Sequence, residues 1–302
     1  MVSREEKLLW AYADLKGEAR ADAINAMWRR LMEEYQRIPL WPEGEAPGYD
    51  PAIPHQLPPS LVLFPVESPK PRGTVLVAPG GGYAIKAPFE GFAVAQRFNE
   101  LGLNAAVLDY RVAPYRRMDA LADAQRALRL LRYRAGEWGL DENHIGMGGF
   151  SAGGHLTGMA ATHFDMGDPA SSDPVERMTD RPDAAILCYG SFSQTTVPSG
   201  FGDSPFADGD RPQKIFMSPE KNLRYDGPPF FLWQTNGQDD PRHVLRLAVE
   251  LTDRGIPFEL HCFPMGNHGL GLADGENEAH VRIEHVMHWV ELCAEWLESL
   301  GF

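Results

Sequence analysis

The stretch from Ile145 to His155, Ile-Gly-Met-Gly-Gly-Phe-Ser-Ala-Gly-Gly-His, constrains the fold of this chain more than any other. Its first half is a short apolar run typical of a buried strand, and the small residues at 152–162 favour a helix. Between them, Gly149-Phe-Ser-Ala-Gly153 fits G-x-S-x-G, a sharp strand-to-helix turn that exposes a serine hydroxyl above a sheet. Because the flanking patterns match what this turn requires, we interpret Ser151 as a nucleophile and not as an ordinary serine in a glycine-rich turn.

Strand-like apolar runs alternate with segments of helical spacing along the rest of the chain. Strands are expected at 61–66, 74–78, 105–110, 145–150, 184–189, 230–235 and 258–263, and helices at 89–101, 119–138, 152–162, 244–254 and 277–300. This alternation predicts an α/β fold with a mostly parallel central sheet and helices on both faces. The irregular segment at 190–228 is too long for an ordinary connection, so we expect a cap insertion over the site.

A helical extension is expected before the strands. Apolar residues recur there at helical spacing: Ile24, Met27, Trp28, Leu31, Met32 and Tyr35. Prolines then occupy 7 of the 21 positions at 39–59, which indicates an extended connector. We therefore divide the chain into an N-terminal helical extension, 1–38, and a main domain, 39–302. The apolar face of the extension must be buried on the main body, on a partner chain or over the site; we expect a chain-to-chain contact or a lid.

Composition limits the partners and the compartment. The chain has 302 residues, of which 43% are hydrophobic, so it can bury one large core. A net charge of −14 and the lack of a long basic stretch argue against nucleic acid and anionic membranes as partners. The three cysteines, Cys188, Cys262 and Cys293, are expected to be small reduced core residues. The first residues do not resemble a signal peptide and no run approaches membrane-spanning length, so a cytoplasmic location is the default expectation.

Several motifs together resemble one superfamily. They are Pro79-Gly-Gly-Gly-Tyr83, Asp109-Tyr-Arg-Val-Ala-Pro114, the Gly149–His155 turn and Phe263-Pro-Met-Gly-Asn-His-Gly-Leu-Gly-Leu272. Over about residues 40–302, the chain resembles the α/β-hydrolase superfamily, and within it a bacterial group of acetyl-xylan-esterase-like and feruloyl-esterase-like carbohydrate esterases. The resemblance implies the α/β-hydrolase fold and ester hydrolysis.

A serine nucleophile needs a base within hydrogen-bond reach, and a third group must orient that base. In α/β-hydrolases, these residues occur along the chain in the order serine, acid, histidine. Among the ten histidines, His268 combines this order with a glycine-flanked loop after the last strand. We therefore expect His268 to be the base for Ser151.

The acid should follow the strand at 230–235, where Asp239 and Asp240 are adjacent. Counting back from a helix that begins near Val244, we expect Asp240 to orient His268. On that count Asp239 is a solvated or loop-bracing neighbour. The reverse assignment stays open, because extra residues precede the pair.

The tetrahedral intermediate of acyl transfer needs backbone N–H groups that face its developing negative charge. The loop at 79–83 follows an early strand, in the place of the HGGG-type loop, although its first residue is proline. We expect the oxyanion hole to consist of the N–H groups of Gly81, Gly82 and Ala152. A plain turn between strand and helix would explain one glycine there, but not three.

The expected function is that of a serine esterase that hydrolyses short-chain, above all acetyl, esters of hydroxylated or carbohydrate substrates. The alternatives are a serine peptidase with the same residues and a non-catalytic binding protein on a hydrolase scaffold. The expected substrate is a small-molecule or oligosaccharide ester, no cofactor or metal is expected, and a homo-oligomer formed through the N-terminal helices is left open. The 190–228 insertion with Tyr83 and Phe89 suggests a closed pocket that favours acetate esters.

Overall fold

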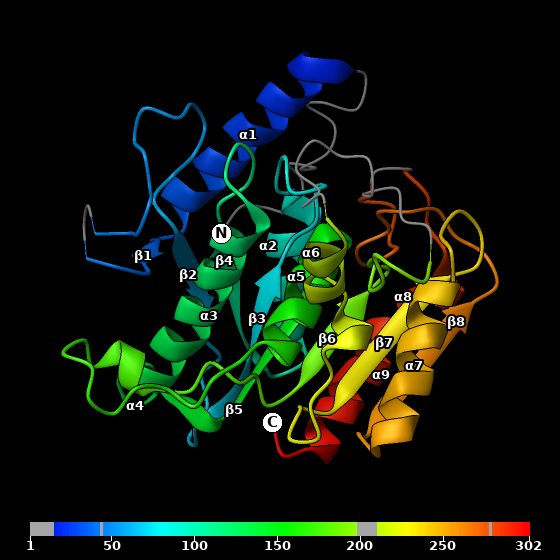
Figure 1. Cartoon of the computed structure of the whole chain (residues 1–302). Helices are drawn as coiled ribbons and strands as arrows, with labels where there is room; N and C mark the ends of the chain where they lie inside the picture. The colour runs from blue at the N-terminus through cyan, green and yellow to red at the C-terminus, as the bar shows by residue number, and fades with distance from the viewer. Residues whose placement is uncertain (1–14, 43–44, 198–209, 278–279) are drawn as a thin grey trace.

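The computed structural model describes residues 15–42, 45–197, 210–277 and 280–302 (Figure 1). Within these ranges, the strands form one sheet with the order β1-β2-β4-β3-β5-β6-β7-β8. Their bounds are β1 (Ile38–Pro39), β2 (Ser60–Phe64), β3 (Arg72–Ala78), β4 (Asn104–Asp109), β5 (Leu140–Phe150), β6 (Ala185–Cys188), β7 (Phe230–Thr235) and β8 (Phe258–Phe263). Strand β2 pairs antiparallel with β1 and β4, whereas the neighbours from β4 to β8 are all parallel. The predicted α/β fold with a mostly parallel sheet is confirmed.

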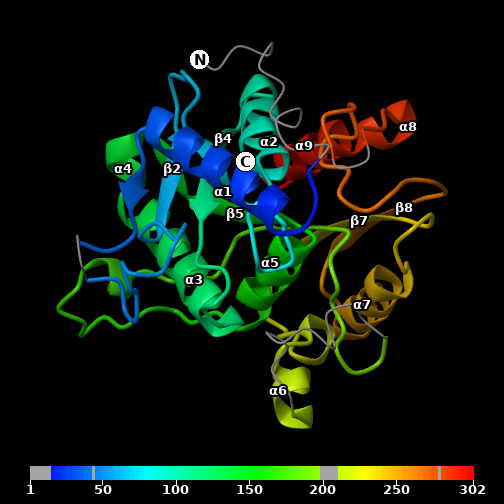
Figure 2. The same cartoon turned by 90° about the horizontal axis from the view of Figure 1, so that it is seen from above.

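Helices cover both faces of the sheet (Figures 1 and 2). Their bounds are α1 (Gly17–Glu34), α2 (Pro88–Glu100), α3 (Arg117–Tyr133), α4 (Ala135–Trp138), α5 (Ala152–Thr162), α6 (Arg211–Phe216), α7 (Arg242–Arg254), α8 (Glu284–Met287) and α9 (Trp289–Ser299), with 3₁₀ turns η1 (Val175–Arg177) and η2 (Pro219–Lys221). The side chains of strand β3 contact the helices on both faces of the sheet, because alternate side chains of a strand point to opposite faces. Val75 and Val77 pack in the cluster of α2 and α9, and Leu76 packs in that of α3 and α5.

The closing helix expected at 277–300 is shorter in the structure. It begins as α8 at Glu284 and continues as α9. At the expected start, the Asn277 side chain donates to Val281 O at 2.7 Å and accepts from Val281 N at 3.1 Å. Such local side-chain bonds offer the backbone an alternative to helix formation, which accounts for the later start. Part of this stretch, 278–279, lies outside the described residues.

Helix α1 packs on its own chain. Trp28, Leu31 and Met32 belong to the same core cluster as Phe92 of α2, and the rings of Trp28 and Phe92 meet edge to face at 5.2 Å. Ile24 is also buried, at 2% exposure. The expectation that these buried residues contact a partner chain is wrong, because the core of this chain covers them.

The cap expected at 190–228 is described only in part, since 198–209 lie outside the described residues. The described part contains α6 and η2. Across the described ranges, we find no helix that is both long and apolar enough to cross a bilayer.

Candidate active site

The turn between β5 and α5 has the strained form that its sequence predicts. Ser151 adopts φ 51° and ψ −115°, a positive φ that non-glycine residues rarely adopt. A Cβ atom on Gly149 would lie 2.2 Å from Gly153 O, and a Cβ atom on Gly153 would lie 2.0 Å from Ala78 O. The two flanking glycines therefore allow backbone segments to pass too closely for side chains, and the turn presents the Ser151 hydroxyl beyond the end of β5.

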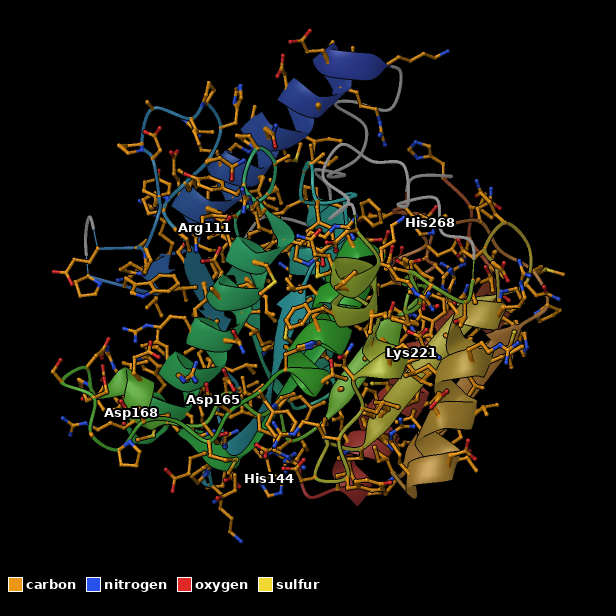
Figure 3. All side chains as sticks on the ribbon, viewed as in Figure 1. Arg111, His144, Asp165, Asp168, Lys221 and His268 are labelled. Atoms are coloured by element: carbon orange, nitrogen blue, oxygen red, sulfur yellow. The ribbon has the colours of Figure 1, made fainter. Side chains whose placement is uncertain are left out.

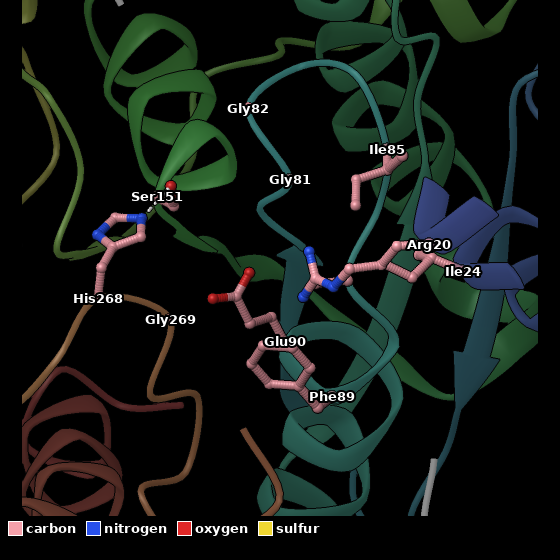
Figure 4. A pocket seen from close by; sticks show the side chains of 11 residues that line it. Arg20, Ile24, Gly81, Gly82, Ile85, Phe89, Glu90, Ser151, His268 and Gly269 are labelled. Atoms are coloured by element: carbon pink, nitrogen blue, oxygen red, sulfur yellow. Dashed lines mark hydrogen bonds between the residues drawn. The ribbon is translucent and has the colours of Figure 1, made fainter. Parts of the chain in front are cut away.

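His268 reaches this hydroxyl from the loop that follows β8. Its Nε2 lies 2.7 Å from Ser151 Oγ (Figure 4). Figure 3 places His268 at the end of the sheet opposite His144, which precedes the apolar run of β5. The carboxyl ends of parallel strands meet at one edge of a sheet, and ligands of open α/β folds bind there. The loops that follow β3, β5, β7 and β8 thus supply this site.

The acid beside His268 is Asp239. His268 Nδ1 lies 2.7 Å from Asp239 Oδ1, so we assign the ring proton to Nδ1, which donates to the carboxylate. Nε2 is then free to accept the proton of Ser151 Oγ. The backbone N–H of His268 also donates to Gln238 Oε1 at 3.0 Å, which fixes the two loops to each other. Ser151, His268 and Asp239 form one continuous hydrogen-bonded chain.

The expectation that Asp240 orients His268 is wrong. The Asp240 carboxylate accepts from Arg242 N at 3.0 Å and from Arg242 Nε at 2.9 Å. Helix α7 begins at Arg242, two residues before the expected start near Val244. Asp240 therefore stabilises the N-terminus of the helix, where N–H groups lack intrahelical acceptors, and Arg242 lowers the pKa of its carboxyl. Counting back from the helix failed because the helix start was misplaced.

The glycine loop after β3 forms the wall opposite His268. Gly81 adopts φ 130° and Gly82 adopts φ 63°. A Cβ on Gly81 would lie 2.3 Å from Ile85 O, so glycine is required there on two grounds. Ala152 is the first residue of α5, and its N–H has no acceptor within the helix. Gly81 and Gly82 line the same pocket as Ser151.

The pocket at Ser151 has a volume of about 320 Å³. It is lined by Arg20, Ile24, Gly81, Gly82, Ile85, Ala87, Phe89, Glu90, Ser151, His268 and Gly269 (Figure 4). Phe89 lines it as expected, whereas Tyr83 does not. The Tyr83 ring is buried and its hydroxyl lies 2.7 Å from His155 Nδ1, so Tyr83 supports the wall from behind.

Two charged side chains line this pocket that the sequence pattern did not predict, Arg20 of α1 and Glu90 of α2. Glu90 is 2% exposed; its Oε2 accepts from Gly80 N at 2.7 Å and its Oε1 accepts from the Tyr189 hydroxyl at 2.7 Å. A charged residue between Phe89 and Phe92, within an apolar segment, was the available signal. Nothing in the pattern of the extension distinguished Arg20 from the other arginines of its helix.

A buried polar cluster supports the wall below the pocket. Trp28 Nε1 donates to Asp109 Oδ1 at 2.8 Å, and Lys86 Nζ donates to the same oxygen and, at 3.0 Å, to Tyr110 O. Lys86 Nζ also lies 5.5 Å from the centroid of the Trp28 ring. These bonds join α1, the end of β4 and the glycine loop, so the three elements hold one another in place.

His155 continues this support toward α5. Its Nε2 lies 2.8 Å from Met217 O and donates to it, while Nδ1 accepts from the Tyr83 hydroxyl. Burial lowers the pKa of His155 to about 3, so the ring is neutral at pH 7. A neutral ring with one donor and one acceptor satisfies both partners. His155 is therefore a packed residue and not a second base.

A nucleophile turn at the carboxyl edge of a mostly parallel sheet defines the class of α/β-hydrolases. The sequence profile of the BD-FAE family matches residues 62–182. One similar solved structure is that of an acetyl ester-xyloside bifunctional hydrolase from Caldicellulosiruptor lactoaceticus, which is 39% identical in sequence. The two structures superpose with a TM-score of 0.82 over 89% of this chain and 97% of the hydrolase chain. A second, MGS-M1, an alpha/beta hydrolase enzyme from a deep-sea metagenome library of the Medee basin, has a TM-score of 0.64 at 24% identity and covers 87% of this chain and 96% of its own.

Curated proteins with similar sequences also include enzymes named for xylan. Acetylxylan esterase of Xylanibacter ruminicola is 35% identical over 70% of this chain, and endo-1,4-beta-xylanase B of Butyrivibrio fibrisolvens is 31% identical over 78%. This chain spans 43% and 38%, respectively, of those two proteins. The chain belongs to the acetylxylan-esterase-like group of the α/β-hydrolases.

Proposed function

We propose that this protein is a serine esterase that removes short acyl groups, above all acetyl, from hydroxylated carbohydrate substrates. The observation that carries the proposal is the chain of two 2.7 Å contacts from Ser151 Oγ through His268 to Asp239. Nucleophile, base and orienting acid in this arrangement activate a serine for acyl transfer. Relatives named acetylxylan esterase and acetyl ester-xyloside hydrolase support the acetyl and carbohydrate parts.

Acylation begins when Ser151 Oγ attacks the ester carbonyl and His268 Nε2 takes the hydroxyl proton. The carbonyl oxygen becomes an oxyanion, for which the N–H groups of Gly81, Gly82 and Ala152 are the candidate donors. Removing one such donor in a related reaction costs about 10²–10³ in turnover. His268 then gives its proton to the leaving alcohol oxygen as the tetrahedral intermediate collapses to the acyl-enzyme.

Deacylation repeats these steps with water. His268 Nε2 takes a proton from the water that attacks the acyl-enzyme, and returns it to Ser151 Oγ when the carboxylic acid leaves. Throughout, Asp239 accepts a hydrogen bond from Nδ1, which holds the ring in the productive tautomer and stabilises the imidazolium. No atom of the substrate other than the acyl carbon forms a covalent bond to the protein.

A pocket of about 320 Å³ that also holds Phe89 and Ile85 supports a short acyl group. We expect acetate esters to be preferred over octanoate esters by at least about tenfold in kcat/KM, which corresponds to about 1.4 kcal/mol. A 4-nitrophenyl ester series from acetate to octanoate measures this preference. Equal or better turnover of octanoate would contradict the short-acyl assignment.

The reaction class is tested with an aminoacyl 4-nitroanilide beside 4-nitrophenyl acetate. We expect rapid turnover of the ester and none of the anilide. Turnover of the anilide would indicate a peptidase, and turnover of neither would indicate a binding protein on a hydrolase scaffold. Labelling by a fluorophosphonate, located on Ser151 by mass spectrometry, would separate an unreactive serine from an unsuitable substrate.

A further inference from the structure

Helix α1 contributes to the pocket although it precedes the region that matches the family profile, 62–182. Arg20 and Ile24, one helical turn apart on one face, both line the pocket at Ser151. The next turns of the same face carry the buried Trp28 and Leu31. Because Trp28 Nε1 is bonded to Asp109, the position of α1 against the pocket is fixed.

Glu90 is the second polar group of this part of the pocket. Its bonds to Gly80 N and to the Tyr189 hydroxyl hold the carboxylate in one orientation, and the Tyr189 hydroxyl in turn accepts from Gly271 N at 2.8 Å. A Cβ on Gly80 would lie 2.5 Å from Glu90 Oε2 and 2.9 Å from Ser151 Cβ. The carboxylate and the nucleophile therefore lie on the same side of the glycine loop.

Figure 4 shows the Arg20 guanidinium and the Glu90 carboxylate pointing toward one another across the pocket, with His268 on the far side of Glu90 in this view. Together they offer several N–H donors and a carboxylate acceptor. An acetyl group has no donor for the carboxylate, and its one acceptor, the carbonyl oxygen, faces the candidate oxyanion donors during the reaction. A sugar ring carries hydroxyl groups that both donate and accept, so this part of the pocket suits the alcohol part of the ester.

We propose that Arg20 and Glu90 form the subsite for the acyl acceptor, and that they bind free hydroxyl groups of a saccharide next to the ester that Ser151 attacks. Arg20 of the N-terminal helix is then a specificity-determining residue. The inference rests on the proposed esterase function and names the chemical class of its leaving group. An alkyl alcohol has no further hydroxyl group to exchange hydrogen bonds with the guanidinium and the carboxylate, so it should gain nothing from them.

The test compares two acetyl esters of similar size, methyl 3-O-acetyl-β-D-xylopyranoside and cyclohexyl acetate, of which the second lacks hydroxyl groups. The variant is Arg20→Met, which keeps an unbranched apolar stem, and the control is Arg29→Met, an exposed arginine on the same helix. We expect Arg20→Met to lower kcat/KM for the xyloside about 10- to 100-fold while changing that for cyclohexyl acetate less than about threefold. Arg29→Met should change neither. An equal loss on both esters, or no loss on the xyloside, would overturn the proposal.

A binding measurement separates this proposal from the esterase function. In a Ser151→Ala background, titration with xylobiose should show binding that Arg20→Met weakens about tenfold or more. Xylobiose binding that depends on Arg20, in a protein that hydrolyses neither ester, would leave the subsite standing and reject the esterase. Hydrolysis of cyclohexyl acetate, without any dependence of saccharide binding or turnover on Arg20, would keep the esterase and reject the subsite.

Discussion

Two sets of polar side chains support the site around Ser151, and they differ in their access to water. The first, which we name the base side, consists of Asp239 and His268. The second, the support side, consists of Trp28, Tyr83, Lys86, Asp109 and His155. The His268 side chain is 35% exposed, whereas those of Lys86 and Asp109 are 4% and 1% exposed. One cluster faces the solvent that a hydrolase needs, and the other is enclosed by α1, the glycine loop and α5.

The difference separates two tasks. A base must exchange protons with substrate and water, so it has to stay reachable, and its hydrogen bonds set its tautomer. Buried polar groups destabilise the fold unless they have partners. Each side chain of the support side makes at least one hydrogen bond within the chain, although Asp109 Oδ2 has no partner among the described residues. Substitutions on the base side should therefore change rates at nearly constant stability, and substitutions on the support side should change stability first.

The largest effect is expected at Ser151 itself. Ser151→Ala should lower turnover of 4-nitrophenyl acetate by about 10⁴-fold or more, since removing one member of such a chain removes most of its catalysis. The midpoint of urea unfolding should stay close to wild type, because the hydroxyl packs against little else. More than about a tenth of the wild-type rate would contradict the nucleophile assignment.

The base side is tested by two adjacent substitutions. Asp239→Asn should lower turnover by about 10⁴, as an amide cannot stabilise the imidazolium and favours the wrong tautomer. Asp240→Asn is the matched control and should cost less than about tenfold, because that carboxylate is paired with Arg242. Steady-state kinetics near neutral pH decides between them. The reverse ranking would return the orienting role to Asp240.

The support side is tested at Trp28. Trp28→Ala should lower the free energy of unfolding by about 3–5 kcal/mol, since it removes a large ring from the core together with a donor to a buried carboxylate. Trp28→Phe keeps most of the ring and should cost less, about 1–3 kcal/mol. Urea denaturation measures both. Unchanged stability in both variants would show that α1 is dispensable.

Deletion of the whole helix extends this test. The sequence alone favours a truncated protein, without residues 1–36, that still folds. The burial of Trp28, Leu31 and Met32 in the main core predicts instead a protein that is strongly destabilised or insoluble. A folded, monodisperse truncation with full stability would reject the structural role of α1.

The smallest expected effect concerns acid stability. The pKa of His155 is lowered to about 3 and that of His243 to about 4, both chiefly by burial. Between these values and about 6.5 the unfolded chain binds more protons than the folded one, so their contribution is complete above pH 6.5 and is lost as the pH falls. Burial raises the pKa of Asp123 and Asp180 to about 6, which acts with the opposite sign in part of this range.

A variant isolates the histidine from these carboxyls. His155→Gln can still accept from Tyr83 and donate to Met217, but it does not titrate. We expect its stability to fall less steeply than that of wild type between pH 6 and pH 4, as measured by urea denaturation at each pH. Parallel pH profiles for the two proteins would contradict the assignment.

Local patterns in the sequence were sufficient for the fold, for the positions of Ser151 and His268, and for the glycine loop and Phe89 at the pocket. Strand β5, the glycines of its turn and α5 are adjacent in the chain, so one short stretch specified both the nucleophile turn and its neighbours. His268 was accessible to the same reasoning, since it follows the last strand in a glycine-flanked loop and the end of a strand fixes where such a loop begins.

The remaining assignments depended on distances of a few ångströms between residues far apart in the chain. Asp239 and Asp240 have the same side chain and are adjacent in the sequence. Helix α7 begins two residues before the expected position, so that Asp240 pairs with Arg242 while Asp239 faces His268. In the sequence, Arg20 and Glu90 are ordinary charged residues of two helical segments. The packing of α1 and α2 places both side chains in the pocket of Ser151. The sequence determined the sheet, the serine and the histidine, because each is encoded in neighbouring residues; only the tertiary structure decided the acid, the place of α1 and the charged end of the pocket, because each depends on how separate helices and loops pack against one another.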